Sequence, residues 1–165
     1  MGMIGCFVAV SEDTLRKLRD DEDAIEEFLY PDDGDSEPEN YVDVDKAWHG
    51  IHYLLTGESG GGQEPLSLAI FGGMEFGPEV GIGSARFLTS SQVAVLANAL
   101  DAISIETLAA RFNPKDMEQK EIYPDVIWVR DNMESLEYLL ENYQQLLSFY
   151  RDAAVRGDAV VQWMS

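Results

Sequence analysis

The spacing of apolar positions divides the chain into short strands and longer amphipathic helices. Three short runs are rich in apolar and β-branched residues, as buried strands are: residues 3–10, 84–89 and 159–164. Apolar residues recur three and four positions apart in four longer stretches, which predicts helices: residues 12–30, 45–56, 92–103 and 132–155. A break near residues 20–23 is expected to split the first stretch into two helices. We therefore expect an α+β fold of the three-layer α/β type, in which helices cover both faces of a small, mixed central sheet. One or two further short strands are expected in that sheet.

Capping residues mark the ends of several predicted helices. Ser11, Ser90 and Ser104 each precede a helical stretch, where a side-chain oxygen can accept hydrogen bonds from the first free backbone N–H groups. Pro114 is expected in the first turn of a short helix. Gly157 is expected to end the longest helix and to turn the chain into the last strand.

Several stretches lack strand or helix periodicity and are expected to be loops. Residues 31–40, PDDGDSEPEN, are acidic, but their spacing is not that of an EF-hand calcium loop. Residues 58–64, ESGGGQE, carry no phosphate-binding motif around their glycines. Residues 72–83 contain five glycines and are expected to be irregular, and residues 126–129 are expected to be extended or a loop.

Residues 41–57, YVDVDKAWHGIHYLLTG, hold the densest group of chemically versatile side chains. In a helix over residues 45–56, the apolar residues form one stripe that faces a core. Asp45 is expected at the N-cap or in the first turn, where its charge meets the helix dipole. Gly57 is expected to end the helix in a left-handed conformation.

Asp45, His49 and His52 are spaced by four and three residues, so they share one face of this predicted helix. That face allows two interpretations. It is a metal or acid–base site, or it is structural, with His49 exposed and His52 half-buried against a backbone carbonyl. We favour the structural interpretation, because the HExxH motif of zinc proteases is absent, and we assign no metal site.

The same segment carries a resemblance to a known family. DVDKAWHGIHYLLTG resembles the DxDKxWxxxHxxLTG signature of the YfbM-like proteins, a bacterial family of unknown function. The opening GMIGCFVAV, the EIYP motif at residues 121–124 and the C-terminal residues 146–165 resemble that family as well. The resemblance covers nearly the whole chain and implies helices around a central sheet. It implies no reaction, and His49 falls on a variable position of the signature.

Composition limits the class of protein. A chain of 165 residues fits one domain, residues 1–165, with a sizeable core. No apolar run is long enough to span a membrane, and no basic region precedes residues 3–10 as a signal peptide would require. Cys6 is the only cysteine, so we expect a buried core residue in a reducing, cytoplasmic protein.

The formal net charge of −20 is the strongest compositional feature. The chain has no basic patch, so we expect no nucleic-acid partner. The charge suits a basic protein partner instead, and one concrete version is an acidic antidote that neutralises a basic toxin. A homodimer through the long C-terminal helix or a strand edge is left open.

Three classes of function remain. The leading one is a binding or interaction module without a cofactor, whose ligand site draws on these residues: Asp43, Lys46, Trp48, His52, Arg86 and Tyr123. The alternative is a hydrolase or transferase, with His52 as general base oriented by Asp43 or Asp45, and with Lys46 or Arg86 stabilising an anion. In the third class the signature only stabilises the fold. Arg86 is expected either to pair with a carboxylate such as Asp43 or to bind an anionic ligand.

Overall fold

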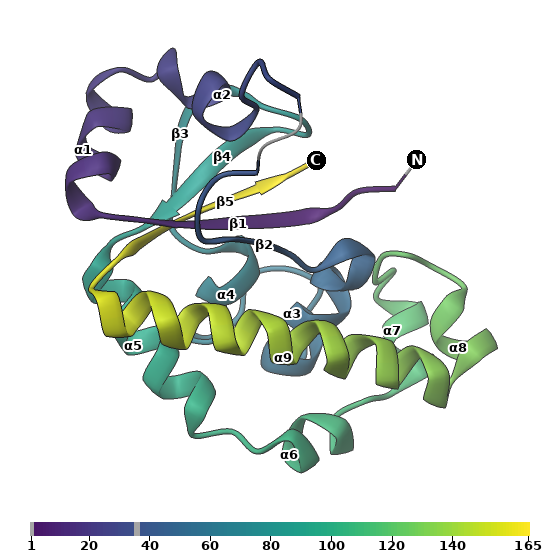
Figure 1. Cartoon of the computed structure of the whole chain (residues 1–165). Coiled ribbons are helices and arrows are strands. Elements are labelled where there is room, and N and C mark those ends of the chain that lie inside the picture. Colours follow the sequence, from purple (N-terminus) through teal and green to yellow (C-terminus); the bar gives the residue numbers. More distant parts are fainter. Residues whose placement is uncertain (1, 35–36) are drawn as a thin grey trace.

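The computed structural model describes residues 2–34 and 37–165, with a five-stranded sheet at its centre (Figure 1). The strands are β1 (Gly5–Val10), β2 (Tyr41–Asp43), β3 (Met74–Glu79), β4 (Ser84–Leu88) and β5 (Ala159–Met164). Their order is β2-β1-β5-β4-β3, and each neighbouring pair is antiparallel. The expected mixed sheet is therefore wrong. The connecting helices join antiparallel neighbours or strands that do not pair, so no parallel crossover unit forms.

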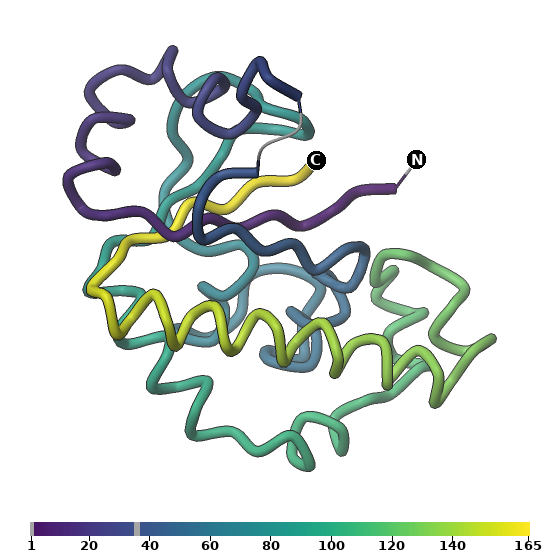
Figure 2. Tube along the Cα trace, in the orientation of Figure 1, coloured from purple at the N-terminus to yellow at the C-terminus, as the bar shows by residue number. Residues whose placement is uncertain are grey.

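Helices cover both faces of the sheet, as Figures 1 and 2 show, and the predicted α+β class is confirmed. The alternation of side chains along β1 explains the two layers. Cys6 and Val8 pack in a core with α1 (Glu12–Asp20) and α2 (Ala24–Leu29). Phe7 and Ala9 point the other way, into the larger core.

The remaining helices lie on the side of the larger core. They are the 3-10 turn η1 (Asp45–Ala47), α3 (Trp48–Thr56), α4 (Leu68–Phe71), α5 (Ser90–Asp101), α6 (Ile105–Ala110), α7 (Pro114–Gln119), α8 (Ile127–Asp131) and α9 (Met133–Arg156). α9 runs the length of this layer and packs against both α5 and α3. It ends at Gly157, whose φ of 74° is left-handed, as predicted.

Most helix ends lie where capping residues predict them. The hydroxyl groups of Ser11 and Ser104 accept backbone N–H bonds at the starts of α1 and α6. The N-cap of α5 lies one residue before the predicted Ser90. Its N-cap is Thr89, which exchanges hydrogen bonds with Gln92 in a capping box, so Ser90 is already inside the helix.

Residues 72–83, expected to be irregular, contain the edge strand β3. Phe76 buries its ring against Phe87 of β4, with 5.1 Å between ring centroids. This contact and the backbone hydrogen bonds to β4 stabilise the strand. The glycine-rich sequence of residues 72–83 does not predict it. Pro78 is tolerated because an edge strand leaves one row of backbone groups unpaired.

Residues 126–129, expected to be extended or a loop, instead enter α8. Trp128 is fully buried, and its indole N–H donates to the carbonyl of Ile122 at 2.8 Å. The burial of Trp128 stabilises α8, and the periodicity of the local sequence does not predict it.

The two predicted loops contain neither helix nor strand where they are described. These stretches are residues 31–34, 37–40 and 58–64. Asp35 and Ser36, which belong to the acidic loop, lie outside the described residues.

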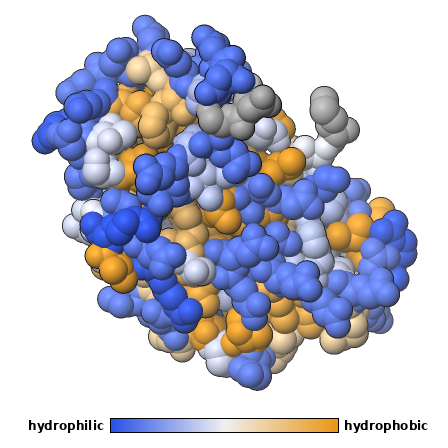
Figure 3. Space-filling model, viewed as in Figure 1, coloured by the Kyte–Doolittle hydropathy of each residue, from blue (hydrophilic) through white to orange (hydrophobic). Residues whose placement is uncertain are grey.

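The face of the molecule drawn in Figure 3 is largely hydrophilic. Figure 3 shows small hydrophobic areas scattered among hydrophilic ones on the face that it presents. None of the helices in the described part of the chain is long and apolar enough to cross a membrane.

Candidate functional site

The segment 41–57 forms a sharp corner between β2 and α3. The carboxylate of Asp43 accepts the backbone N–H of Asp45 at 3.0 Å, and Asp45 has a φ of 47°, a left-handed conformation that short polar residues tolerate. The backbone N–H of Val44 donates to the carbonyl of Gly5 on β1 at 3.0 Å. Asp43 therefore fixes the turn that presents the next two residues.

Tyr138 of α9 fastens this corner from the far side. Its hydroxyl donates to the carboxylate of Asp45 at 2.6 Å and accepts the backbone N–H of Lys46 at 3.0 Å. Burial, the hydrogen bond to Asp45 and its charge raise the pKa of Tyr138, so the hydroxyl keeps its proton. Asp45 lies in the first turn of η1, which is one of its two expected positions, but it is not an N-cap, because its carboxylate binds a distant tyrosine.

Trp48 is the centre of an aromatic stack. Its ring lies parallel to His49, with 4.9 Å between centroids, and close to parallel with Tyr123 at 5.4 Å. The indole N–H donates to the carbonyl of Met3 at 2.9 Å, and the hydroxyl of Tyr123 accepts the backbone N–H of Met3 at 2.9 Å. Trp48 and Tyr123, both expected in a ligand site, thus hold the N-terminal segment against the fold.

His49 uses both ring nitrogens within the protein. Nδ1 accepts the backbone N–H of Tyr123 at 2.8 Å, which leaves the proton on Nε2 to donate to the carbonyl of Ser59 at 2.7 Å. Burial lowers the pKa of His49, although the Ser59 bond acts in the opposite direction. The expectation that His49 is exposed is therefore wrong, because it links α3 to the 58–64 loop.

His52 is fully buried. The ring of Phe71 meets it edge-on at 4.8 Å, and neither ring nitrogen has a hydrogen-bond partner within the described residues. Burial lowers the pKa of His52 to about 4, with a smaller contribution from His49, while the backbone of Gly61 lies near enough to act in the opposite direction without meeting hydrogen-bond geometry. The expected half-buried histidine on a carbonyl is wrong, and the ring is neutral and shielded from solvent.

A hollow of about 450 Å³ opens beside the corner. Its lining comes from η1, the turn before α8, α8 itself and the start of α9: Asp45, Lys46, Pro124, Ile127, Asp131, Glu134, Ser135 and Tyr138. We call it the Lys46 hollow. It includes two signature residues, Asp45 and Lys46, whereas Asp43, Trp48, His52 and Tyr123 are not part of its lining.

Lys46 is the available cation of this hollow. Its ammonium forms no ion pair with any described residue, although the chain carries 31 Asp and Glu. Two of the nearby carboxylates are already engaged, Asp45 by Tyr138 and Asp131 by Arg130. Glu134 is exposed and has no ion-pair partner in the described part of the chain. The hollow therefore offers one positive and one negative side chain to a ligand.

The contribution of α9 to this hollow is not predicted by the sequence. Glu134 and Tyr138 lie one turn apart on α9, which places a polar stripe next to the apolar face of that helix. That polar stripe predicts where the apolar face of α9 ends. It does not reveal which other segment the edge approaches.

Arg86 lies elsewhere. It is on β4, separated from β2 by two strands, where its guanidinium pairs with Glu75 at 2.8 Å and donates to the carbonyl of Gly73 at 3.3 Å. The expected structural ion pair with a carboxylate is confirmed, but its partner is Glu75 and not Asp43, because Arg86 and Asp43 lie on strands that do not touch. Arg86 holds the β3–β4 pair together instead.

A second hollow, of about 520 Å³, lies at the C-terminal end of α3. Arg111 donates from Nη1 to the carbonyls of Leu54 and Leu55, and Lys120 donates to the carbonyl of Gly57. These cations satisfy free carbonyls at the negative end of the helix dipole. We therefore favour the smaller Lys46 hollow, where the cation has no such structural partner.

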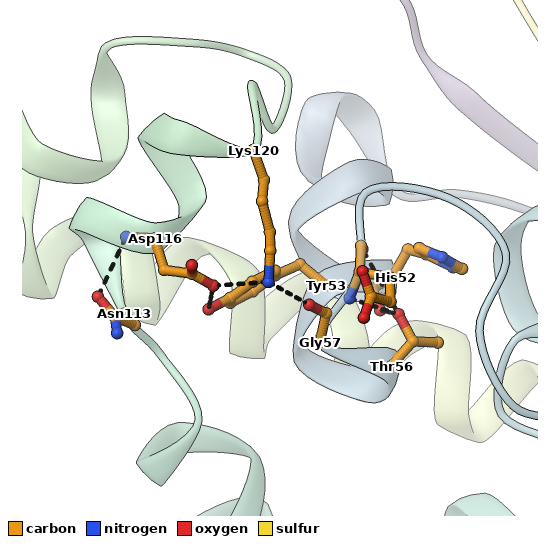
Figure 4. Close-up of polar contacts among 8 residues, drawn as sticks. His52, Tyr53, Thr56, Gly57, Asn113, Asp116 and Lys120 are labelled. Carbon is orange, nitrogen blue, oxygen red and sulfur yellow. Dashed lines mark hydrogen bonds and ion pairs between the residues drawn. The ribbon is translucent and has the colours of Figure 1, made fainter.

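The network beside the α3 end is also internally satisfied (Figure 4). The hydroxyl of Tyr53 and the ammonium of Lys120 both donate to Asp116, at 2.8 and 3.0 Å. These two bonds, Tyr53 first, lower the pKa of the Asp116 carboxyl. The imidazole of His52 points away from this network, so the two do not form a joint site.

Two further groups concern metal and thiol chemistry. Across residues 2–34 and 37–165, the structure contains no cluster of three or more His, Cys, Asp or Glu placed to hold a metal ion. Cys6 is buried on β1, where desolvation raises the pKa of its thiol to about 11. It is a core residue in the protonated form.

Comparisons with known proteins give a family and a fold. A family model described as a domain of unknown function (DUF1877) matches residues 1–163. Protein YfbM of Escherichia coli strain K12 is 29% identical over 164 residues, which cover 96% of this chain and 95% of that protein. The crystal structure of YfbM from Escherichia coli, a protein of unknown function, superposes with a TM-score of 0.76 at 23% identity. That match covers 98% of this chain and 99% of the other.

Proposed function

The chain belongs to the DUF1877 family, and from the geometry of its site we propose that it is a binding module whose ligand occupies the Lys46 hollow. The observation that carries this proposal is that the ammonium of Lys46, which lines this hollow, forms no ion pair with the residues that the structure describes. Arg19, Arg111 and Lys115 also form no ion pair with the described residues. Arg19 lies over the ring of Phe87 and Arg111 binds the carbonyls at the end of α3, whereas Lys46 lines a hollow together with Glu134. A preformed hollow with a few convergent polar groups is the usual form of a ligand site.

The free charges define the ligand. Lys46 can bind a carboxylate or phosphate, and Glu134 can bind an amine or guanidinium. Pro124 and Ile127 line the same hollow and supply apolar contact. We infer a ligand that carries both charges, such as a peptide or a small zwitterionic metabolite.

The hydrolase or transferase alternative gains no support from the geometry. A general base must reach the proton that it removes, directly or through one water. His52 is fully buried, does not line the Lys46 hollow and makes no hydrogen bond to Asp43 or Asp45. The proposed function therefore involves recognition without chemistry on the ligand.

A thermal-shift screen with a matched variant tests the proposal. Wild type, Lys46→Gln and Lys115→Gln are heated with dipeptides, amino acids, nucleotides and divalent metals. Lys115 is an exposed lysine on α7 that forms no ion pair in the described chain, so its variant controls for the loss of one charge. At a hundredfold excess over Kd, binding stabilises the native state by about 2.7 kcal/mol, which raises the midpoint by about 5–10 °C for a chain of this size.

We expect a zwitterionic compound to shift wild type and Lys115→Gln but not Lys46→Gln. A compound that shifts all three variants equally binds elsewhere and counts against the Lys46 hollow. If no compound shifts wild type, a small-molecule ligand is rejected and only the peptide form of the proposal remains.

A further inference from the structure

We propose that the corner between α8 and the start of α9 docks a basic, amphipathic segment of a partner protein, an inference that rests on the Lys46 hollow being a binding site. The docking surface consists of that hollow and three exposed apolar side chains from the same segment of chain, Val126, Val129 and Met133. We call these three residues the α8 tip. They adjoin the hollow in sequence, because Ile127, Asp131 and Glu134 line it.

The three residues of the α8 tip are apolar and largely exposed to solvent. The exposed fractions are 57% for Val126, 44% for Val129 and 61% for Met133, all within eight residues of chain. Figure 3 shows hydrophobic atoms next to hydrophilic ones at the end of the molecule where α8 lies. An apolar cluster rimmed by polar groups is typical of an interaction site, and methionine is common on such surfaces.

The backbone holds α8 in this position at a cost. Val126 has a φ of 79° and Asn132 a φ of 46°, so left-handed residues flank both ends of the helix. For a β-branched residue this is a genuine outlier, and such strain costs of the order of 1–3 kcal/mol. Trp128, buried and bonded to Ile122, keeps the helix in place while its outer side remains uncovered.

Charge decides what kind of segment fits. Around the α8 tip, residues 121–141 contain one base, Arg130, and these acids: Glu121, Asp125, Asp131, Glu134, Glu137 and Glu141. A second copy of this chain would bring the same acids and a net charge of −20 against them. Like-charge contact disfavours that occupant, whereas lysines and arginines on a partner complement the rim.

The occupant is therefore a segment with leucine-like side chains on one face and basic side chains on the other. Its apolar face lies on the α8 tip, in the manner of an amphipathic helix on a hydrophobic surface. Its basic side chains meet Glu134 and the neighbouring acids. Lys46 meets a carboxylate of the same segment.

The test uses a defined probe, a fluorescein-labelled 14-residue peptide of leucine and lysine whose leucines recur three and four positions apart, with one internal glutamate. A scrambled peptide of the same composition removes the apolar face and keeps the charge. Binding is measured by fluorescence anisotropy at 50 and 300 mM NaCl. We expect the patterned peptide to bind at least tenfold more tightly than the scrambled one, and more weakly at the higher salt concentration.

Matched variants locate the binding. Val129→Thr with Met133→Gln makes the α8 tip polar without changing charge, and Val95→Thr with Val155→Thr does the same at exposed positions on α5 and the end of α9. We expect the first pair to weaken binding at least tenfold and the second pair to leave it unchanged. Glu134→Gln is expected to weaken binding about threefold, whereas Asp152→Asn, an equal change of charge at the other end of α9, is not.

The outcomes separate this inference from the proposed function. Equal binding of patterned and scrambled peptides, or equal loss in both apolar variant pairs, overturns the docking surface. If that happens while a small zwitterion still shifts wild type but not Lys46→Gln, the proposed function stands alone. If the patterned peptide binds through the α8 tip but ignores Lys46→Gln, the docking surface exists without the hollow and the proposal as stated is overturned.

Discussion

The polar residues of segment 41–57 divide into those that hold the fold and one that is free to bind. Asp43 and Asp45 bind the backbone and Tyr138, and His49 has both nitrogens occupied. Lys46 keeps its ammonium out of any ion pair with the described residues. The third class of function, a signature that stabilises the fold, thus describes most of these residues but not Lys46.

The bond between Asp45 and Tyr138 predicts a measurable coupling. Tyr138→Phe removes one donor and one acceptor contact, and we expect it to lower the free energy of unfolding by about 1–3 kcal/mol in urea titrations. With Asp45→Asn in a double-mutant cycle, the coupling is expected to be at least about 0.5 kcal/mol. Tyr41→Phe is the control, because the one hydrogen bond of its hydroxyl within the described residues goes to the weak acceptor sulfur of Cys6, at 3.5 Å. Additive losses in the cycle would mean that the two side chains do not interact.

The burial of His52 predicts a dependence of stability on pH. Its pKa is about 4 in the folded state and about 6.5 when unfolded, so the unfolded chain binds more protons between these values. The contribution of neutral His52 to the free energy of unfolding is therefore fully present above pH 6.5, and it is lost as the pH falls toward 4. This group accounts for a loss of the order of 3 kcal/mol.

The variant His52→Leu isolates this effect. It removes the titrating group and two unsatisfied nitrogens, so we expect it to be neutral or stabilising at pH 8. Relative to wild type, its advantage should grow toward pH 5, as measured by urea unfolding across that range. A large loss of stability at pH 8 would show that the ring nitrogens have partners that His52 needs.

Spacing alone predicts the shared face of Asp45, His49 and His52 but not what covers it. His49 meets Ser59 in a loop ten residues later, and Asp45 meets Tyr138, 93 residues away. Partners at such sequence distances depend on how the layers pack. The sequence therefore identifies the important residues and leaves their roles open.

At the scale of elements, local signals perform well for helices with clear caps. Ser11, Ser104 and Gly157 mark helix ends correctly, because capping is a contact between near neighbours. β3 and α8 are missed because Phe87 and Ile122, which stabilise them, belong to other segments. Side-chain contacts between neighbouring segments, 11 and 6 residues apart in these two cases, are not visible in the periodicity of either segment.

At the end of α3, replacing Gly57 by alanine is expected to destabilise the fold through backbone strain alone, without a steric clash. Gly57 has a φ of 78°, and no atom lies within 4 Å of an added Cβ. We expect Gly57→Ala to lower the free energy of unfolding by about 1–2 kcal/mol, the cost of a left-handed alanine. Gly60→Ala is the control, because that site is equally open and is not left-handed. Equal effects from the two substitutions would contradict this account.

The contact between α3 and α9 sets two effects against each other at Gly50. Alanine is favoured over glycine inside a helix by about 1 kcal/mol. A Cβ at this position would approach Leu139 to 2.5 Å and Trp128 to 2.8 Å, and overpacking of a core costs about 1–3 kcal/mol. We expect Gly50→Ala to be destabilising in denaturant titrations, and a stabilised variant would show that the two helices are less closely packed.

At the scale of the whole molecule, charge and fold act separately. Apolar periodicity predicts the α+β class and the three principal strands, while the antiparallel pairing depends on chain paths that periodicity does not reveal. The net charge of −20 predicts partners and solution behaviour but no element of the fold. The resemblance of the sequence to the YfbM-like family is confirmed over the full length.

Self-repulsion predicts that salt stabilises the protein. The ion pairs of the described chain lie at the surface, where each contributes about 0–1 kcal/mol, so screening them costs little. Salt screens the repulsion among the 20 excess negative charges, and this repulsion destabilises the folded state more than the unfolded one. We expect the free energy of unfolding to rise by about 1 kcal/mol between 50 and 300 mM NaCl, a rise of about 2–4 °C in Tm. A fall over that range would mean that the ion pairs outweigh the repulsion.

The central claim is the position of the ligand site, and an NMR titration tests it most directly. Uniformly labelled protein is titrated with the strongest hit of the thermal-shift screen, or with the patterned peptide, and backbone amide shifts are followed. The account predicts that the largest changes lie at Lys46, Ile127, Ser135 and Tyr138, which line the Lys46 hollow. Changes centred instead on Leu55, Thr56 and Arg111, at the end of α3, would contradict it.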